Sequence, residues 1–216
     1  MKISLIHPSR SRPQKSFENS KEWLLKAGEG VDVELIVSID KTDPDIGEYF
    51  DLYPDCIANP NTCVVEAANH AAKAAKGDIL VYLSDDFKCP DNWGQLIIEQ
   101  FKDVTVPLLV KVDDGYQVFG KDVLTIPIMN RALYEKLGYF FHPEYRSMFV
   151  DQHLYHTVNN MGAIRFCPHL LFPHEHYCNG KSKIDETYKR SNMNWDSGKA
   201  LYAKHKSEGF PPYQKV

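Results

Sequence analysis

Short apolar runs alternate with helix-like segments through the first ninety residues of this chain. The runs at 3–6, 33–39 and 79–83 have the length of buried strands, and each is followed by polar residues. Between them, residues 16–27 and 62–76 have the spacing or composition of helices. Strands that alternate with helices in this way form a mostly parallel central sheet flanked by helices, so the sequence predicts an α/β fold.

The length of 216 residues fits one large domain better than two small ones. Neither repeats nor linker-like segments interrupt the chain, and the residues after Trp195 are mainly polar. We therefore expect a single domain over residues 1–195, followed by a loosely docked polar tail over residues 196–216.

Charge and cysteine content restrict the partners and the compartment. The formal net charge of −4 argues against a protein that grips a nucleic-acid backbone. The five cysteines contain no C-x-x-C pair, which indicates free thiols in a reducing compartment. No run approaches the roughly 20 apolar residues that span a bilayer, and the first apolar run is too short for a signal peptide. We expect a soluble cytoplasmic protein without a transmembrane segment, with a homodimer as one possible assembly.

Two carboxylates follow the most apolar run of the chain. Asp85 and Asp86 come after Leu83 and Ser84, at the expected carboxyl end of a strand. Ligands gather at such strand ends, and paired carboxylates there could hold a divalent cation that bridges phosphate oxygens. The alternative is that the two aspartates only cap a turn.

Polar residues also follow the first two apolar runs. Pro8, Ser9, Arg10 and Arg12 form a basic loop that could bind a nucleotide or a phosphate, or that could simply be solvated. Asp40, after the second run, could accept hydrogen bonds from a nucleobase or a ribose, although Asp-Pro segments nearby are also common turn chemistry.

Histidines are concentrated in the second half of the chain. Six of the nine fall within 35 residues, at positions 142, 153, 156, 169, 174 and 176. The pair His174 and His176 has H-x-H spacing, which can bind a transition metal but is neither a zinc-finger nor an H-E-x-x-H pattern.

Read in order, these motifs resemble the GT-A-fold glycosyltransferases, most closely the inverting family 2 type. The resemblance covers residues 3–176 and includes the nucleotide loop at 4–10, the acid Asp40 after the second strand and Asn69 before the segment Ala75-Lys76-Gly77. The segment 84–86 matches the D-x-D metal motif, Val150-Asp151 is similar to the Glu-Asp catalytic motif, and His174 stands where a late metal ligand is found.

The resemblance implies a GT-A fold, which is a Rossmann-like nucleotide-diphospho-sugar transferase fold, with residues 1–195 as the catalytic domain. It implies metal-dependent transfer of a hexose from a UDP-sugar, with glucose or galactose favoured, to the hydroxyl of an unknown acceptor, with inversion. The acceptor could be a glycan, a lipid-linked sugar, a protein or a modified nucleobase.

The resemblance also implies roles for individual residues. Asp151 would be the catalytic base, and Mn²⁺ or Mg²⁺ would be held by Asp86 with His174 or His176. Lys181, Lys183 and Arg190 lie in a polar segment that could close over the phosphates as a lid, or that could be an ordinary surface loop. The expected donor contacts are Pro8, Ser9, Arg10, Arg12, Asp40, Asn69, Ser84, Asp85, Lys181 and Lys183.

Two departures from the family pattern keep other functions open. Ser84 replaces the first acid of D-x-D and Val150 replaces the usual glutamate, which would also suit a non-catalytic nucleotide-sugar-binding or assembly subunit.

A sugar-phosphate nucleotidyltransferase shares the architecture, but it would normally have a G-x-G-x-R loop after the first strand. This chain has no glycine before Gly28.

Overall fold

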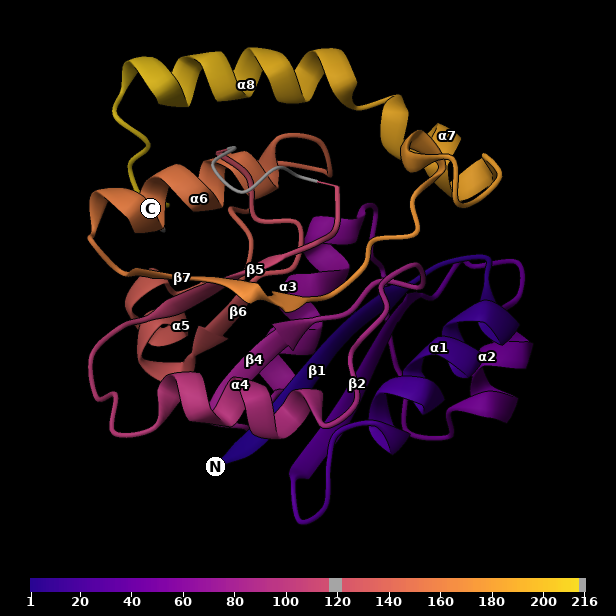
Figure 1. The fold of residues 1–216 in the computed structure, drawn as a ribbon. Helices are drawn as coiled ribbons and strands as arrows, with labels where there is room; N and C mark the ends of the chain where they lie inside the picture. The colour runs from indigo at the N-terminus through magenta and orange to yellow at the C-terminus, as the bar shows by residue number, and fades with distance from the viewer. Residues whose placement is uncertain (117–121, 214–216) are drawn as a thin grey trace.

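The structure is a computed structural model that describes residues 1–116 and 122–213. Within these residues, one sheet is built from the strands β1 (Lys2–Ser9), β2 (Asp32–Asp40), β3 (Ile57–Asn59), β4 (Ile79–Tyr82), β5 (Leu109–Asp113), β6 (Ile128–Asn130) and β7 (Ile164–Leu171) (Figure 1). Their order across the sheet is β3-β2-β1-β4-β6-β5-β7.

Most neighbouring strands of this sheet run parallel. β1 pairs in parallel with β2 and β4, β2 with β3, and β5 with β7, whereas β6 is antiparallel to both of its neighbours. The three apolar runs predicted as strands lie in β1, β2 and β4. The expected α/β architecture with a mostly parallel sheet is therefore confirmed.

Helices cover both faces of the sheet (Figure 1). The described helices are α1 (Pro13–Leu25), α2 (Ile46–Leu52), α3 (Val64–Ala74), α4 (Trp93–Phe101), α5 (Arg131–Leu137), α6 (Val150–Asn160), α7 (Glu186–Asn192) and α8 (Trp195–Ser207), with a short 3-10 turn at Tyr177–Asn179.

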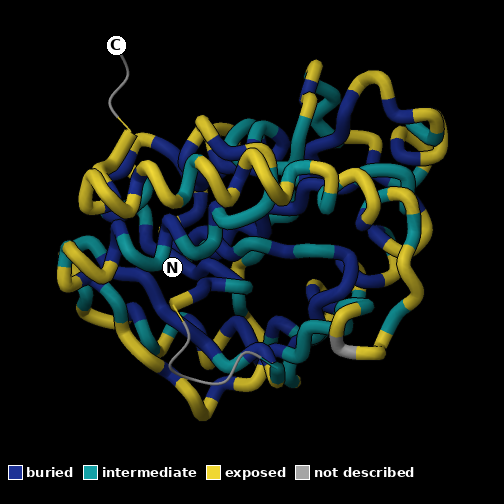
Figure 2. The backbone as a smooth tube through the Cα atoms, turned by 90° about the horizontal axis from the view of Figure 1, so that it is seen from above, coloured by how far each residue is buried: buried dark blue, intermediate teal, exposed yellow. Residues whose placement is uncertain are grey.

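Alternation along β1 explains how the sheet is covered on both sides. Successive side chains of a strand point to opposite faces. Ile3 and Leu5 belong to one core with Trp23 of α1 and Trp93 of α4, whose rings lie 5.0 Å apart. Ile6 belongs to a second core, on the opposite face, with the alanines of α3 and the apolar side chains of α5 and α6. Figure 2 shows the resulting buried strands beneath partly exposed helices.

The chain after Trp195 differs from the loosely docked polar tail that the sequence suggested. Residues Trp195–Ser207 form α8, which runs alongside α6 (Figure 1). Leu201 and Tyr202 pack against the core that contains α6, and His205 and Phe210 are buried. The buried or half-buried positions Gly198, Leu201, Tyr202 and His205 recur at helical spacing, whereas most other positions of α8 are exposed, so the polar composition of the segment did not indicate docking. That residues 1–195 act as one catalytic domain stays a prediction.

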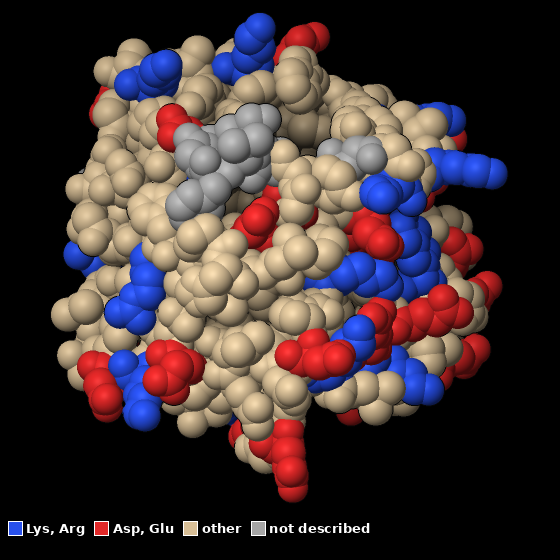
Figure 3. Space-filling view, viewed as in Figure 1, with Lys and Arg blue, Asp and Glu red and all other residues tan. Residues whose placement is uncertain are grey.

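The surface charges, the cysteines and the helix lengths can each be compared with the expectations from composition. The face in Figure 3 carries acidic and basic side chains interspersed with one another. All five cysteines are free thiols, as expected. None of the helices in the described ranges combines the length and the apolar content required to cross a membrane.

Close packing of α8 gives a first prediction. A Cβ atom at Gly198 would lie 2.6 Å from the backbone oxygen of Met148. The Gly198→Ala substitution should therefore lower the free energy of unfolding by about 1–3 kcal/mol, which is about 2–4 °C in Tm for each kcal/mol. Gly47→Ala, where a Cβ would meet nothing within 4 Å, is the matched helical control and should stabilise slightly. A Gly198→Ala protein as stable as the wild type would show that α8 is not tightly docked.

Candidate active site

A cavity of about 320 Å³ lies at the carboxyl ends of β1, β2 and β4. The start of α6 and residues of α7 complete its wall. Because three parallel strands end at the same edge of the sheet, their polar terminal residues converge there. The residues singled out in the sequence that line this cavity are Pro8, Ser9, Arg10, Arg12, Asp40, Ser84, Asp85, Asp86, Asp151, His174, His176 and Arg190.

Three expected donor contacts do not line the cavity. Lys181 and Lys183 are exposed side chains outside it. Asn69 accepts hydrogen bonds from the backbone N–H groups of Phe140 and Phe141, at 2.9 and 2.8 Å, and donates one to the Phe141 oxygen. Its role in this structure is to fix the segment that carries Phe141, which does line the cavity. Asn69 therefore supports the cavity wall through Phe141 and does not line the cavity itself.

Asp85 is buried in a network at the end of β4. Its carboxylate accepts a hydrogen bond from the Ser9 hydroxyl at 3.2 Å and lies 3.6 Å from the Arg12 guanidinium. His7 Nε2 is 3.5 Å from the same carboxylate, and Ser9 is 2.6 Å from the Tyr49 hydroxyl. Burial raises the pKa of Asp85, although the charges of His7 and Arg12 oppose the rise. Asp85 thus positions the loop after β1.

Asp86, the next residue, faces a different set of partners. Its Oδ2 accepts hydrogen bonds from the Tyr188 hydroxyl at 2.7 Å and from His174 Nε2 at 3.2 Å. Burial opposes ionisation, but the hydrogen bond and charge of His174 and the hydrogen bonds from Ser84 and Tyr188 outweigh it, so the pKa of Asp86 lies well below its usual range. Asp86 is therefore held as a carboxylate.

The residues around Asp86 are suited to a divalent cation. One ligand atom each from Asp86, His174 and His176 lie within 4.8 Å of one another. The Oδ1 atom of Asp86 is buried and has no hydrogen-bond partner among the described residues. A buried carboxylate oxygen without a partner is costly, and a cation would satisfy it. One carboxylate and one or two imidazoles form a donor set that Mn²⁺ can use.

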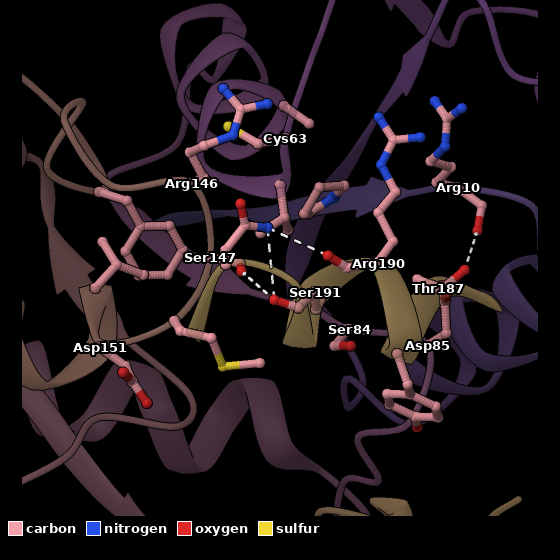
Figure 4. A pocket seen from close by; sticks show the side chains of 18 of the residues that line it. Arg10, Cys63, Ser84, Asp85, Arg146, Ser147, Asp151, Thr187, Arg190 and Ser191 are labelled. Carbon is pink, nitrogen blue, oxygen red and sulfur yellow. Dashed lines mark hydrogen bonds between the residues drawn. The ribbon is translucent and has the colours of Figure 1, made fainter. Parts of the chain in front are cut away.

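Asp151 stands in the first turn of α6, on another part of the cavity wall (Figure 4). The residue before the helix, Phe149, has a left-handed backbone with φ of 69°, which is uncommon outside glycine. Asp151 Oδ1 accepts a hydrogen bond from the Gln152 N–H at 2.9 Å. Burial nevertheless raises the pKa of Asp151 to about 6. A carboxylate with such a pKa is suited to general-base work near neutral pH.

Contacts between the loop after β1 and helix α7 hold these two segments together. Arg12 donates two hydrogen bonds to Asp185, at 2.8 and 2.7 Å, and stacks over the Tyr188 ring. Thr187 donates to the Arg10 backbone oxygen at 3.1 Å (Figure 4). Since Tyr188 also holds Asp86, α7 connects the basic loop to the candidate cation site.

No family model and no curated protein matches this sequence. Solved structures do match in fold. The first 349 residues of S. aureus TarS in complex with UDP give a TM-score of 0.62 at 15% identity, over 80% of this chain and 59% of that chain. Against the longer TarS structure, this chain spans 36% of that chain.

Two further matches cover more of both chains. The Pyrobaculum calidifontis mannosyltransferase PcManGT, in complex with GDP-Man and Mn²⁺, gives a TM-score of 0.61 at 15% identity, over 97% of this chain and 72% of that chain. A Drosophila β1,4-galactosyltransferase 7 mutant, in complex with manganese, UDP-Gal and xylobiose, gives 0.57 at 12% identity, over 88% and 79%. This chain has the GT-A fold.

Within this GT-A fold, the cavity is also lined by Arg146 and Tyr188, which the sequence did not indicate, and by Arg190 of the predicted lid segment. Arg146 and Arg190 donate to the Thr62 backbone oxygen, at 3.1 and 3.4 Å, and both line the cavity. Figure 4 shows Arg10, Arg146 and Arg190 apart from Asp151. Arg190 belongs to the segment considered as a lid, but Arg146 and Tyr188 lie in no recognisable motif. The places of Arg146 and Tyr188 in the cavity wall depend on the packing of segments that are distant in the sequence.

The raised pKa of Asp151 gives a prediction for stability. The folded protein holds this proton up to a pH of about 6, whereas the unfolded chain loses it near pH 3.9. The aspartate therefore destabilises the fold increasingly as the pH rises through that window, and fully above it. Asp151→Asn should raise the free energy of unfolding by about 1–3 kcal/mol at pH 8, and by less than half of that gain at pH 4.5.

Chemical denaturation of the metal-free protein at the two pH values measures this difference. Asp51→Asn, an exposed position on α2, is the matched control and should show no such gain. An equal effect of Asp151→Asn at both pH values would contradict the assigned ionisation.

Proposed function

We propose that this protein is a metal-dependent glycosyltransferase that moves a hexose from a UDP-sugar to an acceptor hydroxyl with inversion. The observation that carries the proposal is the content of one cavity: a candidate cation site at Asp86 and His174, and a separate carboxylate, Asp151, whose pKa is raised to about 6. Donor stabilisation and proton removal need these two kinds of group on different parts of the site.

The fold supports this proposal. The matched structures include a protein in complex with UDP, a galactosyltransferase with manganese and UDP-Gal, and a mannosyltransferase with GDP-Man and Mn²⁺. Uridine with glucose or galactose is our proposed donor. The acceptor hydroxyl could belong to a glycan, a lipid-linked sugar, a protein or a modified nucleobase. The free thiols favour a cytoplasmic setting.

Several side chains of the cavity would bind the donor. Asp40, which forms an ion pair with Arg10 and accepts two hydrogen bonds from Thr42, is placed to accept from the nucleobase or the ribose. Arg10, Arg146 and Arg190 would offset the negative charge of the diphosphate. Asp85 already has Ser9 and Arg12 as partners, so it would act by holding these residues in place.

Asp86 and His174, with His176 beside them, would hold Mn²⁺ or Mg²⁺. A bound divalent cation stabilises the charge that develops on the departing diphosphate. Asp151 would accept the proton of the acceptor hydroxyl as its oxygen forms a bond to the anomeric carbon. The bond from that carbon to the diphosphate oxygen breaks, and UDP leaves with the electron pair. Attack from the face opposite the leaving group gives inversion.

The role of Asp151 separates this proposal from a non-catalytic nucleotide-sugar-binding subunit. Asp151→Asn keeps the side-chain size and the oxygen that accepts from Gln152, but it cannot take a proton. We expect UDP release from UDP-glucose or UDP-galactose to fall by a factor of about 10²–10⁴, with donor affinity unchanged.

The measurement is UDP production with a panel of hydroxyl acceptors, water included, together with calorimetric titration of each donor. Asp51→Asn serves again as the control and should retain full turnover. Full turnover by Asp151→Asn would remove Asp151 as the base, and UDP binding without turnover by the wild type would favour the non-catalytic alternative.

A further inference from the structure

A second group of histidines lies outside the candidate active site. His142 is in the segment between α5 and α6, His153 is on α6 and His205 is on α8. All three are buried, with exposed fractions of 3%, 0% and 3%, and none lines the donor cavity. One ring nitrogen from each lies within 4.8 Å of one from each of the others. The ring centroids are 4.4 to 4.8 Å apart.

Two of these rings have a buried nitrogen without a hydrogen-bond partner in the described structure: His142 Nδ1 and His153 Nε2. For His153 the hydrogen bonds also indicate which nitrogen carries the proton. The Thr157 hydroxyl donates to the Phe210 backbone oxygen at 3.3 Å, so its oxygen is left to accept from His153 Nδ1 at 3.4 Å. The Nε2 atom of His153 is then an unprotonated nitrogen with a buried lone pair.

His205 has a contact that is typical of metal-bound histidines. Its Nε2 lies 3.1 Å from the Glu144 carboxylate and donates to it. Its other nitrogen, Nδ1, is left as an acceptor beside the Tyr145 hydroxyl, at 3.1 Å. A carboxylate on the far nitrogen orients the ring of a metal ligand and increases the basicity of the binding nitrogen. Glu144 therefore prepares His205 Nδ1 as a ligand.

The charge state of the cluster fits the same role. Burial, together with the charge of neighbouring histidines, lowers the pKa of His142 to about 4 and that of His153 to about 3. Both rings are thus neutral at physiological pH. Neutral imidazole is the form that binds metals. Two buried ring nitrogens in the same place without a hydrogen-bond partner among the residues that the structure describes are unusual, because a buried polar atom that nothing satisfies is costly.

We propose that His142, His153 and His205 bind one divalent cation of the zinc class, at a site separate from the donor cavity. Three imidazole nitrogens favour Zn²⁺, Co²⁺, Ni²⁺ or Cu²⁺ over the oxygen-seeking Mg²⁺. Zn–N bonds of about 2.0–2.1 Å in a tetrahedron place ligand nitrogens about 3.4 Å apart, so nitrogens that lie within 4.8 Å of one another would have to approach by about 1.4 Å at most. The Tyr145 hydroxyl, which is hydrogen-bonded to His205 Nδ1, would either move away from this nitrogen or become the fourth ligand of the cation.

The site would join three segments that are far apart in the sequence. Residues 142–145, α6 and α8 meet at it, and the backbone oxygens of Gly209 and Phe210 accept hydrogen bonds from Asn160 and Thr157 of α6. Helix α7, which precedes α8, carries the Tyr188 that holds Asp86. A cation here would therefore fasten the C-terminal part of the chain that helps to enclose the donor cavity, without taking part in transfer.

Cobalt binding to the full chain tests this site. The titration uses the His174→Ala/His176→Ala protein as a background, so that the histidines of the donor cavity cannot take up the probe. We expect one Co²⁺ per chain, with the visible absorption of tetrahedral cobalt, and displacement of that absorption by Zn²⁺. Adding His153→Gln should weaken the affinity by about a hundredfold.

His156→Gln in the same background is the matched control. His156 is the next histidine on α6, but it is hydrogen-bonded to Tyr202 and is not one of the three grouped ligands. Unchanged cobalt binding by this control supports the site. Failure of the background protein to bind Co²⁺ or Zn²⁺ would overturn the proposal and leave a packed histidine cluster, even if His153→Gln does not fold. Because the readout is metal binding, this result is independent of glycosyl transfer.

Discussion

The burial of two adjacent carboxylates at the end of β4 constrains the rest of this structure. A buried charge is costly unless it is paired and hydrogen-bonded. Asp85 finds its partners on the N-terminal side, in Ser9 at the end of β1 and Arg12 after it. Asp86 finds its partners 88 and 102 residues later, in His174 and Tyr188. Satisfying both carboxylates therefore brings the two halves of the chain together, and the cavity forms where they meet.

Arg12 links the two networks. It faces Asp85, forms a two-bond pair with Asp185 and stacks on Tyr188, which in turn donates to Asp86. These contacts explain why neighbouring aspartates differ: burial dominates at Asp85 and raises its pKa, whereas the partners of Asp86 overcome burial and lower its pKa. One carboxylate supports the loop, and the other keeps a buried oxygen available for a cation.

Much of the fold and part of the site could be predicted from the sequence, because both depend on local patterns. Apolar runs became β1, β2 and β4, and the polar residues at their ends met as parallel strands require. Asn69, Lys181 and Lys183 did not join the cavity, since composition does not show which way a side chain faces. Arg146, Tyr188 and the docking of α8 depend on contacts across the chain. The excess of histidines was visible in the sequence. The sequence did not show that His174 and His176 lie in the donor cavity, whereas His142 and His153 group with the distant His205.

In the function proposed above, Asp86 and His174 hold a cation that a bound uridine diphosphate requires. Calorimetric titration of UDP with and without Mn²⁺, on the wild type and on Asp86→Ala, measures this requirement. We expect Mn²⁺ to strengthen UDP binding to the wild type by about tenfold or more, which is about 1.4 kcal/mol, and Asp86→Ala to remove this gain. Mn²⁺-dependent binding that survives in Asp86→Ala, or UDP binding by the wild type that ignores Mn²⁺, would contradict it.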